Sequence, residues 1–174
     1  SALRAKGLQV DCIFMQGHQL HTDDFLGKFD SSIKAFGQAG FEVVLSELDI
    51  SVLPDGWKCC RNTSLYDYSP SDQQMLNPFP KGMDQETAEL QRQKWTDMFK
   101  MLLDNKQYIT DVHLWSATDK YSWYNKWPIQ GRTDYPTLFN RKHMAKPQYY
   151  DVLRLGSTSP PVGTVIPDLP TSTK

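Results

Sequence analysis

One apolar run, residues 43–50 (VVLSELDI), constrains the fold of this chain more than any other stretch. A continuous run of this length predicts a strand that is buried on both faces, as in parallel sheets. Within it, Glu47 and Asp49 are two residues apart, so a strand would project both carboxylates to the same side. Burying two like charges side by side is costly, which favours a functional role for the pair. The structural alternative is a buried ion pair with a lysine or arginine.

The segments on either side of this run predict an alternation of strands and helices. Strands are expected at residues 8–15 and 108–115, and helices at residues 30–39, 84–105 and 144–155, with Asp30 as the N-cap of the first helix. The pattern is clearest in the middle helix, where these apolar residues recur at helical spacing: Leu90, Trp95, Met98, Phe99, Leu102 and Leu103. Strand, helix and strand joined by short links predict right-handed βαβ units and a parallel sheet.

Two regions depart from this alternation. Residues 51–83 form a long irregular region with four prolines, and a loop of this length is usually functional or an insertion. Residues 157–174 are rich in Pro, Ser and Thr and are expected to be a linker or a disordered tail. We therefore expect one α/β unit over residues 1–156. Since three parallel strands cannot bury both faces of a sheet by themselves, this unit is expected to be part of a larger one.

The composition excludes several classes of function. The formal net charge of −1 gives no electrostatic footprint for nucleic acid, and no apolar run approaches the length of a membrane span. The three cysteines lack the spacing of metal ligands, so we expect neither a metal nor another cofactor. Aromatic residues reach 12%, which suits sugar stacking, although most aromatic side chains simply pack in cores.

Polar and aromatic side chains gather where the predicted strands end. The first strand leads into Gln16 and His18, and the last leads into Trp115 and, further on, Trp123. In α/β folds the chemistry lies at the carboxyl ends of the strands. A lone histidine or tryptophan at such a place is more often structural. Beside Glu47, however, an imidazole can bridge the two carboxylates and hold Glu47 ionised and oriented.

These residues, in this order, resemble glycoside hydrolase family 10, the endo-β-1,4-xylanases. The resemblance rests on residues 16–18 (QGH), 46–50 (SELDI), 114–115 (LW), 119–123 (DKYSW), 135–140 (YPTLFN) and 146–150 (KPQYY). It covers nearly the whole chain except the long loop and the tail. The loop is larger than in compact members and resembles the expanded xylanases of gut Bacteroidetes.

The resemblance implies a fold, an activity and a set of site residues. The fold would be the TIM (β/α)8 barrel, of which this chain matches the last three βα units, the C-terminal part. Glu47 matches the catalytic nucleophile, and His18 and Asp49 match its hydrogen-bonded partners. Gln16, Trp115 and Trp123 match sugar-contacting positions. The expected substrate is xylan or xylo-oligosaccharides, and the expected location is secreted or at the cell surface.

The sequence also departs from the family pattern. Ser46 stands where threonine is usual, and Ser116 stands where glycine is usual. The family's acid/base glutamate belongs to an earlier strand with an Asn-Glu motif, and no Asn-Glu pair occurs here. The chain is therefore expected to need the N-terminal part of the barrel as a partner and to be inactive as an isolated fragment. The alternatives are a non-catalytic carbohydrate-binding fragment and a related barrel β-glucanase.

Overall fold

The computed structural model of the chain describes residues 2–56 and 63–156. The expected tail at residues 157–174 lies outside the described residues. Strand β3 (Glu42–Ser51) is central and pairs in parallel with all the other strands. β1 (Cys12–Met15) and β2 (His18–Leu20) pair with successive parts of β3, and β4 (Ile109–Leu114) also pairs with it. The predicted parallel sheet is confirmed, but the first strand is shorter than residues 8–15, and β2 follows it as a separate element.

Three longer helices accompany the strands: α1 (Leu26–Gln38), α4 (Gln85–Asp104) and α5 (Pro147–Gly156). α4 agrees with prediction, since Asp84 caps it by accepting a hydrogen bond from the Thr87 backbone N–H. The predicted start of α1 at Asp30 was wrong. The helix begins four residues earlier without a side-chain cap, and the Asp30 carboxylate instead pairs with Lys34 one turn along.

α5 also begins later than predicted, at Pro147 rather than at residue 144. Ala145 pairs with Phe139 in an antiparallel bridge, and the Lys146 backbone N–H donates to the Leu138 carbonyl. These bonds hold residues 145–146 in extended backbone. Proline has no N–H to donate and is favoured at the first position of a helix, so α5 starts there.

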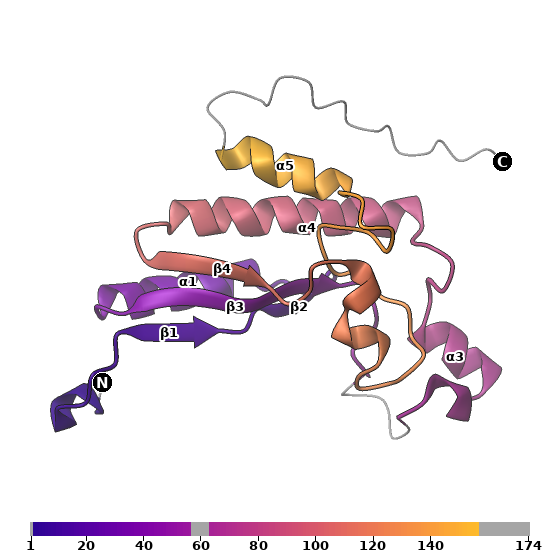
Figure 1. The fold of residues 1–174 in the computed structure, drawn as a ribbon, viewed down its shortest axis with the longest axis horizontal. Coiled ribbons are helices and arrows are strands. Elements are labelled where there is room, and N and C mark those ends of the chain that lie inside the picture. Colours follow the sequence, from indigo (N-terminus) through magenta and orange to yellow (C-terminus); the bar gives the residue numbers. More distant parts are fainter. Residues whose placement is uncertain (1, 57–62, 157–174) are drawn as a thin grey trace.

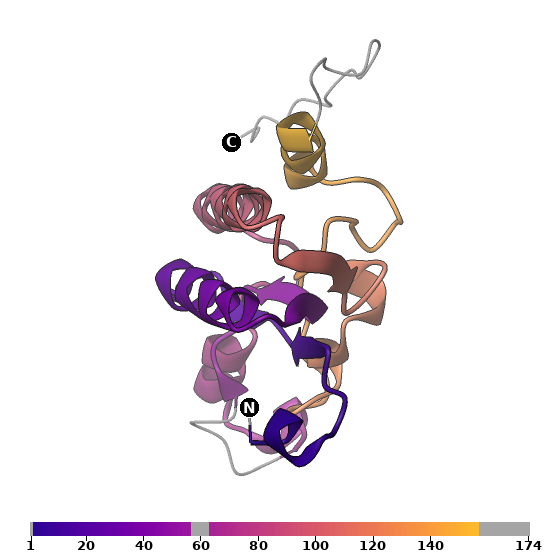
Figure 2. The ribbon, with the colours of Figure 1, turned by 90° about the vertical axis from the view of Figure 1, so that its left-hand side faces the viewer.

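α1 and α4 lie side by side on one face of the sheet, and α5 lies beyond α4 (Figures 1 and 2). Trp95 and Met98 of α4 and Ile33 of α1 are fully buried against β3. Burying a side chain of this size stabilises the fold by about 1.5–3 kcal/mol. Two α4 residues expected in this core, Leu90 and Leu103, are exposed instead.

A polar side chain occupies the core position beside Leu90. The Gln91 amide is fully buried, and its Nε2 donates to the carbonyls of Ile50 (2.6 Å) and Tyr135 (2.8 Å). These bonds satisfy the buried amide and attach α4 to the carboxyl end of β3. The polar residue therefore fixes where the strand end lies relative to the helix layer.

A register shift in β3 decides which way its carboxylates point. Val43 and Leu45 belong to the core beneath the helices, and so do Leu48 and Ile50. Strict alternation cannot place residues 43, 45, 48 and 50 on one face. The pairing of β3 with β4 shifts register between Leu45 and Leu48. On the other side of β3, the sequence separation of paired residues changes by one between the β1 pairing and the β2 pairing. This bulge turns Glu47 and Asp49 to the face opposite the helices.

The region after β3 is more ordered than predicted. Beyond residues 57–62, which lie outside the description, it contains a 3₁₀ turn (Leu65–Asp67) and helix α3 (Pro70–Leu76). Ser69 caps α3, with its hydroxyl accepting from the Asp72 backbone N–H. Ser64 pairs with Gln130, which ties this region to the segment after β4. We refer to residues 63–83 as the insert.

The face of the sheet opposite the helices is open in the described part of the chain. Phe14, paired with Val44, is 66% exposed, and Asp111 on the other side of Val44 is exposed. β1 and β4 each pair with no described strand other than β3. The sheet thus has two unpaired edges and an exposed apolar side chain.

These edges predict how the isolated chain behaves. Unpaired strand edges recruit other chains, so the 174-residue chain expressed alone is expected to be aggregated, oligomeric or molten. Light scattering and thermal melts measure this directly. A monodisperse monomer that melts cooperatively would contradict the prediction.

Candidate active site

His18 bridges the two carboxylates of β3. Its Nε2 lies 3.1 Å from Glu47 Oε2, and its Nδ1 lies 3.0 Å from Asp49 Oδ1. The Glu47 side chain keeps 22% of its surface exposed, whereas that of Asp49 keeps 2%. No described lysine or arginine forms an ion pair with either carboxylate. The alternative of a buried ion pair with a lysine or arginine is therefore not observed in the described part of the chain. One carboxylate is therefore accessible and the other is a buried support.

Two tryptophans surround this bridge. Trp123 Nε1 donates to Asp49 Oδ2 at 3.0 Å, and its ring lies 4.7 Å from the His18 ring, centroid to centroid. Trp115 meets the same imidazole edge-on at 6.1 Å and is 46% exposed. Asp49 is thus bonded on both oxygens, and Trp115 offers open aromatic surface next to Glu47.

The Gln16 side chain forms no hydrogen bond with the bridge residues, although its backbone does. Its carbonyl accepts from the Glu47 backbone N–H at 2.8 Å, and its side chain is exposed. Gly17 follows with φ +91°, a conformation that side chains rarely adopt, and a Cβ there would lie 3.3 Å from the Leu48 backbone. The glycine lets the chain turn between β1 and β2, and this turn brings His18 level with Asp49.

The bridge favours the protonated form of His18. Burial by itself would lower the pKa of His18, but the hydrogen bonds and charges of Asp49 and Glu47 outweigh it and raise that pKa. Burial raises the pKa of Asp49 despite the bonds from His18 and Trp123. Both ring nitrogens donate only in the imidazolium form. The cluster therefore favours a protonated imidazole that fixes one oxygen of Glu47 and leaves Oε1 without a hydrogen bond from any described residue.

This arrangement offers an accessible, oriented carboxylate beside an aromatic surface. No group of three or more His, Cys, Asp or Glu suited to a metal ion occurs among residues 2–56 and 63–156. No helix in the described part is long and apolar enough to cross a membrane.

The family model of glycosyl hydrolase family 10 matches residues 1–155. This chain belongs to that family. The endo-1,4-beta-xylanase A of Xylanibacter ruminicola is 32% identical over 158 residues, which are 88% of this chain and 41% of the relative. A beta-1,4-xylanase of Dictyoglomus thermophilum is 29% identical, over 87% of this chain and 38% of the relative. The family 10 chain thus spans about two fifths of the length of the curated relatives it matches.

Solved structures give the same result for the fold. A family 10 endoxylanase from a sugarcane soil metagenome superposes with a TM-score of 0.77 at 29% identity, over 90% of this chain and 42% of that one. A mutant protein in complex with xylotriose superposes with a TM-score of 0.71 at 25% identity, over 87% and 41%. The solved relatives are TIM barrels, and the family 10 chain forms part of such a barrel, as the sequence predicted.

A buried ion pair between Asp119 and Lys146, which the sequence did not predict, supports the segment beside the site. Lys146 Nζ lies 3.3 Å from both carboxylate oxygens of Asp119 and donates to the Tyr135 carbonyl. Asp119 also accepts from the backbone N–H and the hydroxyl of Thr137, both at 2.9 Å. These bonds hold the segment between Trp115 and Trp123. Both residues lie in motifs that mark the family, but nothing in their spacing showed that they meet.

The buried carboxylate of Asp134 lies just beyond the carboxyl end of β3. Asp134 Oδ1 accepts from the backbone N–H groups of Val52 (3.1 Å) and Tyr135 (2.8 Å). Burial raises its pKa to about 6, despite hydrogen bonds from Ser51 and the backbone. The folded state therefore takes up a proton at this site between pH ~4 and ~6 that the unfolded chain does not.

This proton uptake predicts a pH-dependent effect of Asp134→Asn. Because the folded pKa is raised, the wild-type free energy of unfolding falls as pH rises from about 4 to about 6, by about 3 kcal/mol for this group alone. The amide keeps the acceptor and removes the charge, so the variant is expected to gain stability relative to wild type over that range. Urea unfolding of a complete barrel containing this chain at pH 4 and pH 8 measures the difference. Asp104→Asn, at an exposed position at the end of α4, is the control, and parallel pH profiles for Asp134→Asn and wild type would contradict the assignment.

Proposed function

We propose that this chain supplies the nucleophile half of an endo-β-1,4-xylanase that hydrolyses xylan with retention of configuration. The observation that supports this most is the bridge from Glu47 through His18 to Asp49 in a family 10 chain. It orients an accessible carboxylate whose Oε1 receives no hydrogen bond from any described residue. The curated relatives named above are xylanases.

The proposed reaction has two steps. Oε1 of Glu47 attacks the anomeric carbon while a carboxylic acid protonates the departing glycosidic oxygen, giving a glycosyl-enzyme and a shortened chain. The same carboxylate that gave the proton then takes one from water, which attacks the anomeric carbon and releases Glu47. His18 and Asp49 keep the nucleophile in place and do not touch the sugar.

The second carboxyl group is proposed to come from a part of the family barrel outside this chain. Retaining enzymes place the two carboxyl groups about 5–5.5 Å apart. Asp49, the nearest candidate in sequence, is buried and bonded on both oxygens, so it is not free to act as acid/base. The isolated chain is therefore proposed to be inactive.

Trp115 and Trp123, with Gln16, are proposed to line the sugar site. Trp115 presents an open ring beside His18, and Gln16, whose carbonyl accepts from the Glu47 backbone N–H, has an exposed side chain. Trp123 is committed to Asp49 through its N–H, so it would offer only its ring. A solved relative at 25% identity was crystallised with xylotriose, which supports a xylo-oligosaccharide as the ligand. A secreted or cell-surface location is proposed with this function, because xylan is an extracellular polymer.

The test is hydrolysis by a complete barrel that contains this chain. Xylan, carboxymethyl cellulose and mixed-linkage β-glucan are compared, with Glu47→Gln as the inactive control. Cleavage of xylan in preference to the two glucans supports the proposal. Preference for a glucan would favour a β-glucanase, and binding to xylan without turnover would favour a carbohydrate-binding role.

The His18 bridge gives a second prediction. In the complete barrel, His18→Ala is expected to lower kcat on xylan at least tenfold, as the loss of supporting residues at metal sites costs about 10–100-fold. The KM for xylan is expected to change little, since His18 does not face the sugar. His143→Asn, at an exposed histidine outside the sheet whose left-handed backbone asparagine tolerates, is the matched control. A kcat near that of wild type would remove His18 from the mechanism.

A further inference from the structure

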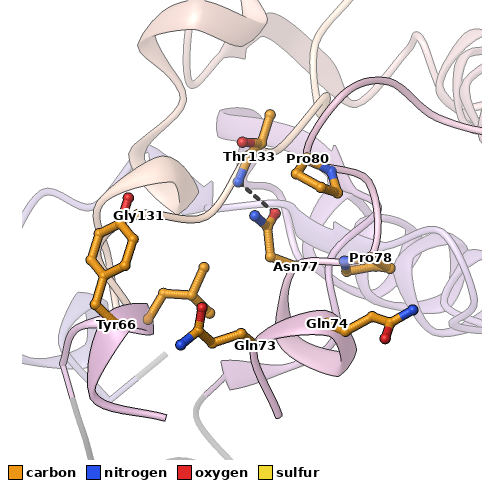
Figure 3. A pocket seen from close by; sticks show the side chains of 9 residues that line it. Tyr66, Gln73, Gln74, Asn77, Pro78, Pro80, Gly131 and Thr133 are labelled. Atoms are coloured by element: carbon orange, nitrogen blue, oxygen red, sulfur yellow. Dashed lines mark hydrogen bonds between the residues drawn. The ribbon is translucent and has the colours of Figure 1, made fainter. Parts of the chain in front are cut away.

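A cavity beside the insert lies apart from the site around Glu47. Its volume is about 530 Å³, within the ~300–1,000 Å³ of small-molecule sites. The walls come from the insert and from the segment after Gln130. Figure 3 shows the lining residues, which are Leu65, Tyr66, Gln73, Gln74, Asn77, Pro78, Pro80, Gly131 and Thr133.

Tyr66 provides an exposed aromatic surface on one side of this cavity. Its side chain is 77% exposed, although the ring rests against Gly131 (Figure 3). A Cβ at residue 131 would lie 3.2 Å from the Tyr66 ring, and Gly131 has a φ of +99°. Two features therefore favour glycine at residue 131: its left-handed backbone and the close approach of the Tyr66 ring. One side of the ring is supported, and the rest stays open to a ligand.

The amides of Gln73 and Asn77 lie on the side of the cavity toward Tyr66, whereas the Gln74 amide points away from it (Figure 3). Gln73 donates its Nε2 to the Tyr68 carbonyl, and no described residue donates to its Oε1. Asn77 accepts from the Thr133 backbone N–H at 2.8 Å, and no described residue accepts from its Nδ2. The exposed amide of Gln74 makes no hydrogen bond within the described chain. A donor and an acceptor that remain available suit the hydroxyl groups of a sugar.

No lining residue that the structure describes carries a charge, and this bears on the class of ligand. The described lining offers aromatic and amide groups and no lysine or arginine to pair with a carboxylate or phosphate. A neutral pyranose presents an apolar ring face for Tyr66 and hydroxyl groups for the amides. The chemistry of the lining therefore fits an uncharged sugar unit.

The cavity lies at the same end of the sheet as Glu47. Figure 1 shows α3 beyond the carboxyl ends of the strands. The Gly131 backbone N–H donates to the Asn125 carbonyl, in the 3₁₀ turn that begins with Trp123. A short hydrogen-bonded segment thus connects Gly131, which lines the cavity, to Trp123, whose Nε1 donates to Asp49.

We propose that the insert forms a remote sugar subsite, in which Tyr66 stacks on a neutral xylose unit of a xylan chain engaged at Glu47. This inference rests on the proposed function, since it assumes that the chain engaged there is xylan. It predicts that Tyr66 matters for long substrates and not for short ones.

The test compares substrates of two lengths in a complete barrel that contains this chain. Tyr66→Ala is expected to lower kcat/KM on unsubstituted xylan about tenfold, a loss within the ~1–3 kcal/mol of aromatic stacking platforms. The kcat/KM of the same variant on an aryl xylobioside is expected to stay within about twofold of the wild-type value. Tyr66→Phe keeps the ring and is expected to match wild type. Met75→Ala, an exposed α3 residue outside the lining, is the matched control. No loss on xylan, or an equal loss on both substrates, would overturn the subsite.

A binding arm separates failure of the subsite from failure of the proposed function. Calorimetric titration of xylohexaose into Glu47→Gln, with and without Tyr66→Ala, measures binding without turnover. About tenfold weaker binding with Tyr66→Ala supports the subsite even if the wild type cleaves neither substrate, a result that would defeat only the proposed function. Xylohexaose binding that Tyr66→Ala leaves unchanged overturns the subsite. So does a preference of Glu47→Gln for an acidic glucuronosyl oligosaccharide over xylohexaose, if Tyr66→Ala removes that preference.

Discussion

A 2-deoxy-2-fluoro xylobioside with a good leaving group is expected to attach covalently to Glu47 in a complete barrel that contains this chain. Such a leaving group needs little protonation to depart, so labelling depends on the nucleophile more than on the acid/base group. The fluorine slows hydrolysis of the glycosyl-enzyme, which therefore accumulates. Peptide mapping is expected to place the added mass on the fragment that contains residues 46–49.

Variants of the bridge sharpen this experiment. Glu47→Ala is expected to abolish labelling and to lower kcat on xylan by about 10⁴-fold or more, the scale seen when a nucleophile is removed. Added azide is then expected to restore cleavage of an activated substrate with inverted stereochemistry, since it attacks from the vacated side. Asp49→Asn is expected to slow labelling without moving it, because Asp49 acts through His18. A label on Asp49, or on no carboxylate of this chain, would refute Glu47 as nucleophile.

The strand that holds this residue was predictable, whereas its bulge was not. An apolar run around two carboxylates is a strong signal, and Glu47 and Asp49 do project together from β3. The extra residue between Leu45 and Leu48 leaves no trace in composition. Uninterrupted alternation from Val43 would have turned both carboxylates beneath the helices, into the apolar core. Tertiary pairing, and not local propensity, sets the face on which the site lies.

Helix boundaries failed where the usual signals were missing or misleading. α1 begins after Phe25, which offers no capping side chain, whereas Asp30, a residue type that favours N-caps, predicted a start inside the helix. In α4, apolar spacing placed Leu90 in the core, but the buried position belongs to Gln91. A glutamine that bonds two carbonyls from distant segments cannot be recognised from periodicity, because its partners are 41 and 44 residues away in sequence.

The insert shows a different limit. Its prolines and polar residues predicted irregular backbone, yet Ser69 and Pro70 are a regular helix start. What could not be predicted is the pairing of Ser64 with Gln130, which brings Tyr66 onto Gly131. Only this long-range contact turns an irregular loop into a wall of a cavity.

The pair Asp119–Lys146 leads to the second large effect. Lys146→Met in a complete barrel is expected to lower the free energy of unfolding by about 3–5 kcal/mol, because it leaves the Asp119 carboxylate buried without its cation. Burial raises the pKa of Asp119 and lowers that of Lys146, so desolvation already opposes both charges in the native pair. Chemical denaturation followed by tryptophan fluorescence measures the change, with Lys142→Met at an exposed lysine four residues away as control.

Removing the second charge tests the cause. Asn at position 119 keeps an oxygen that can accept from Thr137 and carries no charge. The double variant Asp119→Asn/Lys146→Met is therefore expected to be more stable than Lys146→Met alone, since the uncompensated charge is gone. The double variant would still lack the bonds from Lys146 to residue 119, between Trp115 and Trp123, and to the Tyr135 carbonyl, so activity on xylan is expected to recover less than stability does. If the double variant were as unstable as Lys146→Met, the loss would come from packing of the lysine stem, and the buried charge would not be its cause.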